Sequence, residues 1–233
     1  MRRDEIAADT ALLRRSLASG RFTLPVEPYG SGRTERCVET PWALAGAAGA
    51  RRLLDVGYAH AEPAYADGLR RVDAPEVYGL DLVQRRLGGV RGVVGDLREA
   101  PFRDGFFDRI LCISTIEHVG CSADVYGVAD VARDEDGDIR AAAEIGRMLA
   151  PGGRALVSVP FGAPQRFEWM IQYDAERLAR LVEATGLASL ASRFFGYAGD
   201  GWRETDAGAL SGARYGEGAP AAAGVALLEL ERP

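Results

Sequence analysis

The sequence has few cysteines, and they are not paired. Its three cysteines are Cys37, Cys112 and Cys121, and no two of them form a CxxC pair. This argues against a disulfide framework and against a cysteine-rich zinc cluster. We therefore expect a protein of the reducing cytoplasm.

The sequence also lacks long hydrophobic runs and an excess of positive charge. No stretch approaches the ~20 apolar residues that span a bilayer. Asp4 and Glu5 follow Met1-Arg2-Arg3, where a signal peptide would have an apolar segment. The formal net charge of −6 gives no basic field to attract nucleic acid. We expect neither a membrane nor a nucleic acid as partner.

The 233 residues are 47% hydrophobic and 27% charged, as is typical of a globular protein with a sizeable core. No internal repeat or linker divides the chain, so we predict a single domain over residues 1–233. Residues 1–50 are expected to form a helical lid or cap, and residues 51–233 a Rossmann-like core. The oligomeric state stays open, a homodimer included.

Residues 51–83 have the pattern of a nucleotide-binding βαβ unit. An apolar run over 53–56 breaks at Gly57, a helical segment follows over 63–71, and a second apolar run over 77–80 ends in Asp81. Gly57 permits a sharp turn close to a ligand, and Asp81 is placed to accept hydrogen bonds from two ribose hydroxyls. A crossover without a ligand is the alternative for this stretch alone.

The remaining elements predict a largely parallel sheet. Strands are expected over 90–97, 109–114, 154–159, 190–197 and 225–231, and helices over 4–19, 41–48, 138–149 and 174–185. Thr40 is the expected N-cap of the second helix, with Pro41 at its first position. Together these elements predict a Rossmann-like, seven-stranded, mostly parallel sheet with helices on both faces and one antiparallel edge strand. Ligands of such sheets lie beyond the carboxyl ends of the strands.

Four stretches at these strand ends resemble the class I S-adenosylmethionine-dependent methyltransferases, closest to the small-molecule branch. They are LLDVGYAHAE, GLDL, VGDLREAPFRDGFFDRILCISTIEHVG and EIGRMLAPGGRALVSVP. The resemblance covers residues 50–160 strongly and implies S-adenosylmethionine as cofactor. It implies that Asp55 and Gly57 line the methionine end, that Asp81 holds the ribose, and that Asp96 and Leu97 contact the adenine. The other implied cofactor contacts are Tyr58, Ala59, Leu82, Gly95 and Ser114.

The loop at residues 58–61 departs from the family pattern, because Tyr58, Ala59, His60 and Ala61 replace small glycine-rich residues. The same alanines disfavour a nicotinamide-dependent oxidoreductase, whose fingerprint has three glycines. The altered loop also leaves open a protein that binds S-adenosylmethionine without catalysis.

Methyl transfer requires the protein to position the acceptor and to remove its proton. His118 is one of only two histidines and follows the fourth predicted strand, so it is the candidate general base, with Glu117 beside it. The alternative is that both residues only brace their loop. His60 is expected either to contact a ligand or to be structural.

A divalent metal is conceivable but not favoured. The ubiquinone-pathway O-methyltransferases use a glutamate and the Glu-His pair as metal ligands, and Ser114 stands at the position of that first glutamate. The acidic loop over 120–138 could supply other carboxylates, but we expect it to be solvated.

The expected activity is O-methylation of a sugar-containing or secondary-metabolite acceptor, which suggests natural product biosynthesis. N-methylation of a small molecule is the alternative. Aromatic residues are expected to line the acceptor pocket or to belong to the core: Tyr29, Tyr126, Phe161, Phe167, Trp169, Tyr173 and Trp202. Arg33, Arg36 and Glu39 are expected either in the lid or as a solvated charged segment.

Overall fold

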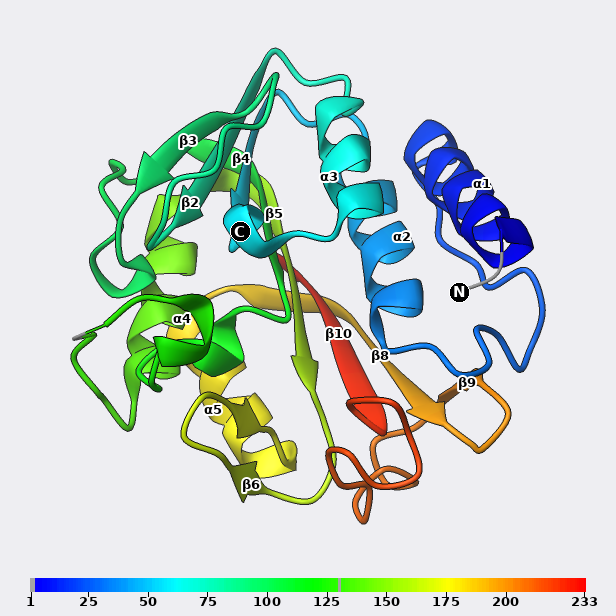
Figure 1. Ribbon diagram of the computed structural model, residues 1–233. Coiled ribbons are helices and arrows are strands. Elements are labelled where there is room, and N and C mark those ends of the chain that lie inside the picture. Colours follow the sequence, from blue (N-terminus) through cyan, green and yellow to red (C-terminus); the bar gives the residue numbers. More distant parts are fainter. Residues whose placement is uncertain (1–2, 130) are drawn as a thin grey trace.

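The computed structural model describes residues 3–129 and 131–233, with side chains from residue 10 onward. In this part of the chain, eight strands form one sheet in the order β3-β2-β1-β4-β5-β10-β8-β9 (Figure 1). The strands are β1 (Arg52–Val56), β2 (Glu76–Asp81), β3 (Arg91–Val94), β4 (Phe107–Ile113), β5 (Leu149–Pro160), β8 (Ala188–Tyr197), β9 (Trp202–Thr205) and β10 (Gly224–Glu231). A separate hairpin pairs β6 (Gln165–Arg166) with β7 (Ile171–Gln172).

The pairing confirms the predicted Rossmann-like sheet. The strands from β3 to β5 are parallel, whereas β10 runs antiparallel between β5 and β8. The short strand β9 adds an antiparallel edge to β8. The sheet therefore has eight strands instead of the predicted seven, because the four residues of β9 lie in a stretch whose sequence has the glycines and alanines of a loop.

Helices cover both faces of the sheet (Figure 1). One face carries α1 (Arg3–Ser19), α2 (Arg36–Gly46) and α3 (Pro63–Arg70), and the other carries α4 (Gly137–Met148) and α5 (Ala175–Thr185). Asp174 caps α5 as predicted, since its carboxylate accepts a hydrogen bond of 2.8 Å from the N–H of Arg177.

Helix α2 begins at Arg36, five residues before the predicted start, and contains Pro41 in its interior. Thr40 does not cap it. Its hydroxyl donates a 2.6 Å hydrogen bond to the carbonyl of Arg36, one turn earlier. Residues 37–45 of the helix are buried. We attribute the longer helix to this burial, which outweighs the single backbone bond that Pro41 cannot make.

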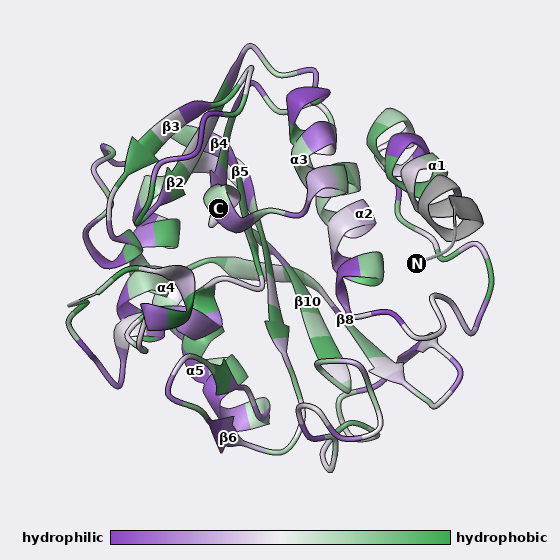
Figure 2. Ribbon diagram, viewed as in Figure 1, coloured by the Kyte–Doolittle hydropathy of each residue, from purple (hydrophilic) through white to green (hydrophobic). Residues whose placement is uncertain are grey.

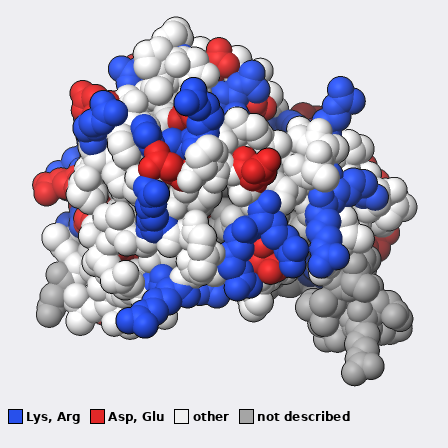
Figure 3. Space-filling model, turned by 90° about the horizontal axis from the view of Figure 1, so that it is seen from above, with Lys and Arg blue, Asp and Glu red and all other residues white. Residues whose placement is uncertain are grey.

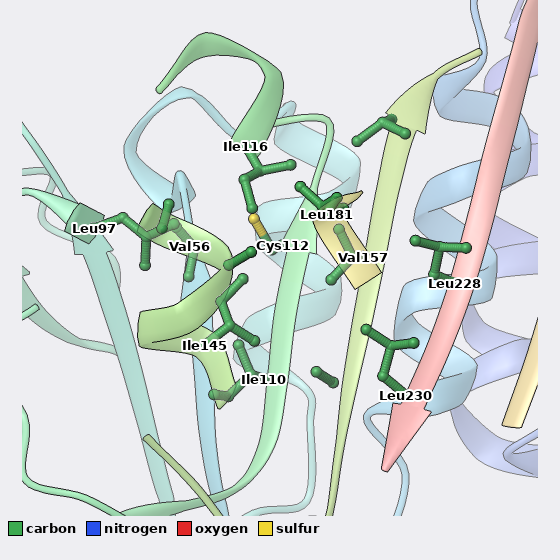
Figure 4. Close-up of a cluster of buried hydrophobic side chains, with 14 of the residues drawn as sticks. Val56, Leu97, Ile110, Cys112, Ile116, Ile145, Val157, Leu181, Leu228 and Leu230 are labelled. Atoms are coloured by element: carbon green, nitrogen blue, oxygen red, sulfur yellow. The ribbon is translucent and has the colours of Figure 1, made fainter. Parts of the chain in front are cut away.

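The sheet separates two hydrophobic clusters. Hydrophobic residues follow the central strands in Figure 2. Beneath α4 and α5, side chains from the strands interlock with those of the helices (Figure 4). Cys112 belongs to this cluster, and all three cysteines are buried and free. The core thus fixes the strands whose carboxyl ends carry the polar residues described next.

Candidate functional site

A cavity of about 240 Å³ opens at the carboxyl ends of β1, β2, β3 and β4. It brings together nine of the twelve residues that the sequence placed in the site: Asp55, Gly57, Asp81, Leu82, Gly95, Asp96, Leu97, Ser114 and His118. The three others, Tyr58, Ala59 and Glu117, do not line it. Arg36, Tyr65, Thr115 and Tyr126 also line the cavity, and the sequence did not assign them to the cofactor or to catalysis.

Asp55 lies at the bottom of the cavity and is almost fully buried. The hydroxyl of Tyr65 donates a 2.5 Å hydrogen bond to its carboxylate. Burial raises the pKa of Asp55 to about 7, and the bond from Tyr65 opposes that rise. The residue is therefore poised between its neutral and charged forms near neutral pH.

Gly57 makes the turn that the sequence predicted for it. Its φ is +84°, and its N–H bonds the carbonyl of Leu80 at 2.8 Å. A Cβ at this position would lie 2.4 Å from the hydroxyl oxygen of Thr115. That hydroxyl bonds the carbonyls of Val56 and Ile113. Only glycine fits between these two strand ends.

Tyr58 points away from the cavity and is fully buried. Its ring packs against Gly79 of β2 and Gly92 of β3, where added Cβ atoms would lie within 2.5 Å of the ring or hydroxyl. Its hydroxyl donates to the carbonyl of Arg85 and accepts from the N–H of the same residue. The predicted cofactor contact of the Tyr58 side chain is therefore not seen, because the bulk of the ring is accommodated between two glycines in the core.

Asp81, at the end of β2, binds backbone N–H groups of the turn after β1 and of the residues that follow its own strand. One carboxylate oxygen accepts from the N–H of Ala59 at 3.0 Å, and the other accepts from the N–H of Val83 at 3.2 Å. A carboxylate offers about four lone-pair positions, so two remain for a ligand. Ala59 thus contributes through its backbone, which donates to Asp81.

Asp96 follows β3 and is bonded closely by one arginine. The guanidinium of Arg98 donates to both carboxylate oxygens, at 2.6–3.0 Å, and the Arg98 N–H donates at 2.8 Å. Burial would raise the pKa of Asp96, but the bonds from Arg98 lower it overall. Asp96 is therefore a charged acceptor at the rim, and Arg98 lines the same cavity.

Ser114 closes the end of β4 in a left-handed conformation, with φ of +39°. Its hydroxyl donates a 2.7 Å bond to Glu39, which is fully buried in α2. Glu39 in turn pairs with Arg36 at 2.9 Å. Both α2 residues are consequently held in a packed helix against the site, and the solvated reading of these two residues is wrong.

His118 faces the cavity with a defined tautomer. Its Nδ1 lies 2.7 Å from the carbonyl oxygen of Trp169. A carbonyl can only accept, so Nδ1 carries the proton and Nε2 carries the lone pair. The hydroxyl of Tyr126 lies 3.1 Å from Nε2. Burial lowers the pKa of His118 to about 4, so the ring is neutral at physiological pH.

Glu117 is buried behind His118 and does not line the cavity. Its Oε1 lies 3.7 Å from Nε2 of His118. Its Oε2 is buried and finds no hydrogen-bond partner in the described part of the chain. Burial raises the pKa of Glu117 well above its ordinary value, and the nearby charge of Arg36 opposes this rise. The side chain supports the imidazole from behind.

Aromatic side chains form a wall beside His118. Trp169 lies between β6 and β7 and stacks on the imidazole with a centroid separation of 5.4 Å. Phe167 and Tyr215 contact Trp169 in turn, and Tyr126 contacts both histidines. Of the predicted pocket aromatics, only Tyr126 is among the described residues that line the cavity, and Phe167, Trp169 and also Tyr215 lie outside this lining. Four others are buried in the core: Tyr29, Phe161, Tyr173 and Trp202.

The described residues hold no group of three or more histidines, cysteines and acids placed to bind a metal. Asp130 of the acidic loop lies outside them. Parts of that loop, Ser122, Ala123 and Tyr126 among them, line the cavity. None of the described helices has the length and apolar composition of a membrane span.

A family model described as a methyltransferase domain matches residues 26–197. The chain belongs to this methyltransferase family. The match spans most of the chain and includes every residue of the cavity, which confirms the resemblance to S-adenosylmethionine-dependent methyltransferases. No curated protein sequence matches the chain.

Solved structures share the fold of this methyltransferase at low sequence identity. The cyclase SpnF has a TM-score of 0.56 at 18% identity, over 97% of this chain and 94% of its own. The N-methyltransferase NodS from Bradyrhizobium japonicum, in complex with S-adenosylhomocysteine, has a TM-score of 0.53 at 13% identity. The match covers 97% of this chain and 98% of NodS. A Burkholderia thailandensis 1,6-didemethyltoxoflavin-N1-methyltransferase, also with bound S-adenosylhomocysteine, has a TM-score of 0.52 at 15% identity. The match covers 97% of this chain and 80% of that enzyme.

Proposed function

We propose that this enzyme methylates a hydroxyl oxygen of a small-molecule acceptor, with His118 as the general base. The observation that carries the proposal is the 2.7 Å bond between Nδ1 of His118 and the carbonyl of Trp169. This bond fixes the tautomer and leaves the lone pair on Nε2, next to the Tyr126 hydroxyl.

The residues of the cavity fit S-adenosylmethionine. Asp81 holds the ribose with its two remaining lone-pair positions. Asp96 and Leu97 hold the adenine, and Asp55 lies at the methionine end. Arg36 lines the same cavity and provides a cation for the cofactor's carboxylate. When bound, the cofactor supplies an electrophilic methyl group on a sulfonium.

A hydroxyl acceptor needs its proton removed as it attacks, whereas the electrophile needs no activation by the protein. The ring of His118 is neutral near pH 7, since burial has lowered its pKa to about 4, so the lone pair of Nε2 is available for that proton, although the same burial makes the ring a weaker base than a solvated imidazole. The Tyr126 hydroxyl bonds Nε2 in the structure, and the acceptor hydroxyl takes its place.

The wall formed by Trp169, Phe167 and Tyr215 lies beside His118, with ring planes inclined to one another by 35–78°, and offers the acceptor single aromatic faces. A planar ring or the apolar face of a sugar stacks on such a wall. We therefore keep a sugar-containing or secondary-metabolite acceptor, and with it a role in natural product biosynthesis. The free cysteines are in keeping with a cytoplasmic enzyme.

One observation favours N-methylation as a second candidate. Glu35, Glu39 and Glu117 are all buried around the single cation Arg36. Such an excess of carboxyl groups would suit a cationic amine. Two enzymes of the same fold are named as N-methyltransferases. An amine loses its proton before attack and then needs only positioning.

The test compares wild type with His118→Gln on hydroxyl and amine acceptors found by screening. If the acceptor is a hydroxyl, His118→Gln should lose about 10²–10⁴-fold in rate and keep its affinity for S-adenosylhomocysteine. His60→Gln, which removes the other histidine, should lose far less. A His118→Gln rate within about threefold of wild type would remove His118 as the base and favour the amine acceptor. If a chelator abolished the activity and magnesium restored it, a metal ion would take part in the reaction, which would contradict a mechanism that relies on His118 alone as the base.

A further inference from the structure

A second cavity, of about 260 Å³, lies on the face of the sheet that carries α1, α2 and α3. It shares no lining residue with the methyltransferase site. It lies at the opposite end of the strands, where β4 and β5 begin and β10 ends. Figure 3 looks onto that end of the molecule, and arginine side chains are spread over it. Every basic side chain of the sequence other than histidine is an arginine.

Three arginines from three strands converge on this cavity: Arg109 of β4, Arg154 of β5 and Arg193 of β8. Arg109 and Arg154 are register partners across the parallel pair. The only carboxylate in the described lining is that of Glu229 on β10. The described lining thus carries three cations and one anion, and two further carboxylates, Glu204 and Glu231, pair with two of these cations.

Two of the three arginines are already paired. Arg154 bonds Glu229 at 3.0 Å and Glu231 at 3.2 Å. Arg193 bonds both carboxylate oxygens of Glu204 at 2.7 Å. Both guanidiniums are thereby held in place at the cavity wall, while part of their donor capacity remains free.

Arg109 is different, because its side chain has no bonding partner among the described residues. Its Nε is buried and makes no hydrogen bond. The neighbouring carboxylate, Asp108, is turned to the backbone N–H groups of Arg51 and Arg52. Burial and the adjacent charge of Arg154 lower the pKa of Arg109, and the charges of Asp108 and Glu229, which make no hydrogen bond to its side chain, only partly oppose this. An unpaired, half-buried cation next to a like charge is unfavourable unless an anion joins it.

The rest of the lining is apolar, from Phe22, Trp42, Leu156 and Leu227. The guanidinium carbon of Arg193 lies over the ring of Phe22, 5.2 Å from the ring centroid. The cavity thus has a cationic floor on the sheet and an apolar wall under α2. Such a combination fits a small molecule with an oxyanion at one end.

We propose that this cavity binds an oxyanion, the phosphate or carboxylate group of a small molecule, and that Arg109 is its principal donor. The planar guanidinium presents parallel N–H groups that match two oxygens of such an anion. The site is independent of methyl transfer and does not rest on the acceptor chosen above.

The experiment is a calorimetric titration of the full chain with inorganic phosphate and, separately, with acetate, in chloride buffer. Wild type should bind at least one of the two saturably. Arg109→Gln should weaken that binding at least about tenfold, because it removes charge-assisted bonds. Arg86→Gln makes the same charge change at an exposed arginine and should leave the binding unchanged. Tighter phosphate indicates a phosphoryl ligand, and tighter acetate indicates a carboxylate.

The proposal fails if wild type binds neither anion, or if Arg109→Gln binds as wild type does. S-adenosylhomocysteine affinity of Arg109→Gln serves as the control for folding and should equal that of wild type. If the variant does not fold, the Nε–H resonance of Arg109 in the wild-type NMR spectrum provides the test. It should shift on addition of the anion, and a resonance that does not move overturns the proposal.

Discussion

Asp81 combines two tasks in one side chain. Its oxygens hold the N–H groups of Ala59 and Val83, and the same carboxylate borders the cofactor cavity. Shape and charge of the site therefore depend on one residue at the end of β2. A substitution here acts on the turn and on the ribose contact together.

We predict that Asp81→Ala weakens S-adenosylhomocysteine binding at least about tenfold, since each charge-assisted bond is worth roughly 1.5–3 kcal/mol. Calorimetry measures the affinity, and a thermal melt shows that the domain still folds. Asp73→Ala removes an exposed aspartate and should leave the affinity unchanged. Unaltered affinity in a folded Asp81→Ala protein would exclude the ribose assignment.

We predict that the imidazole of His118 titrates near pH 4 and not near its usual 6.5, because burial disfavours the charged ring. The bond to Trp169 opposes this shift without reversing it, and the nearby charge of Arg36 adds to it. An NMR titration of the ring protons checks it, with His118→Gln to assign the signal. Methyl transfer should accordingly stay constant between about pH 5 and 8 as far as this base is concerned. A midpoint above pH 6 would contradict the buried environment.

At the residue scale, the sequence predicted most of the cavity but not its inner contacts. Nine of the expected residues follow strands and line one cavity, because strand ends are visible in the sequence as apolar runs that stop at a polar residue. Their roles toward the cofactor stay predictions. Tyr58 was misplaced because nothing local shows that Gly79 and Gly92 leave room for its ring. The bonds from Tyr65 to Asp55, and from Ser114 to Glu39, join distant segments and needed the structure.

At the scale of elements, the site depends on the fit between the turn after β1 and the end of β4. Gly57 and Thr115 meet there, and a Cβ on residue 57 would lie 2.4 Å from the Thr115 hydroxyl oxygen. We predict that Gly57→Ala lowers Tm and weakens S-adenosylhomocysteine binding at least about tenfold, since both strain and the clash act on the turn. A melt and a titration measure the two effects.

Gly49→Ala provides the matched control. Gly49 also has a positive φ, of +75°, but a Cβ there would meet nothing within 4 Å. The two variants share the conformational penalty of roughly 1–2 kcal/mol, so the excess loss in Gly57→Ala measures the clash with Thr115. Equal losses in both variants would show that the contact is unimportant.

Elements with strong periodicity were predicted well, including α3, α5, β4 and β10. The start of α2 was missed because a Thr-Pro pair is a strong local start signal, and burial of the helix overrides it. The lid role of residues 1–50 stays a prediction. With α2 packed against the sheet, any closing movement falls to residues 21–35, of which Tyr29 pairs with Trp202 of β9.

At the scale of the whole molecule, the fold buries several carboxyl groups that the unfolded chain would ionise. Burial raises the pKa of Glu35 and of Asp55 to about 7, and that of Glu117 well above its ordinary value. Their ordinary values are 3.8–4.5. At pH values between the ordinary pKa and the raised pKa of each group, the folded state holds a proton that the unfolded state has released. The free energy of unfolding therefore falls as pH rises through this range. The lowered pKa of His118 makes stability rise with pH below pH 6.5, but this single group is outweighed by the three carboxyl groups.

We therefore predict that Tm is higher at pH 6 than at pH 8, with a change of about 2–4 °C for every kcal/mol of stability lost. The pH dependence arises largely from the buried acids, so Glu117→Gln, which cannot ionise, should flatten it and raise Tm at pH 8 relative to wild type. Glu183→Gln alters an exposed glutamate and should leave the profile as it is. Melts over pH 5–8 at constant ionic strength measure all three proteins. A wild-type Tm that rises toward pH 8 would mean that these carboxyl groups are solvated or paired with cations in the folded state and do not retain their protons there.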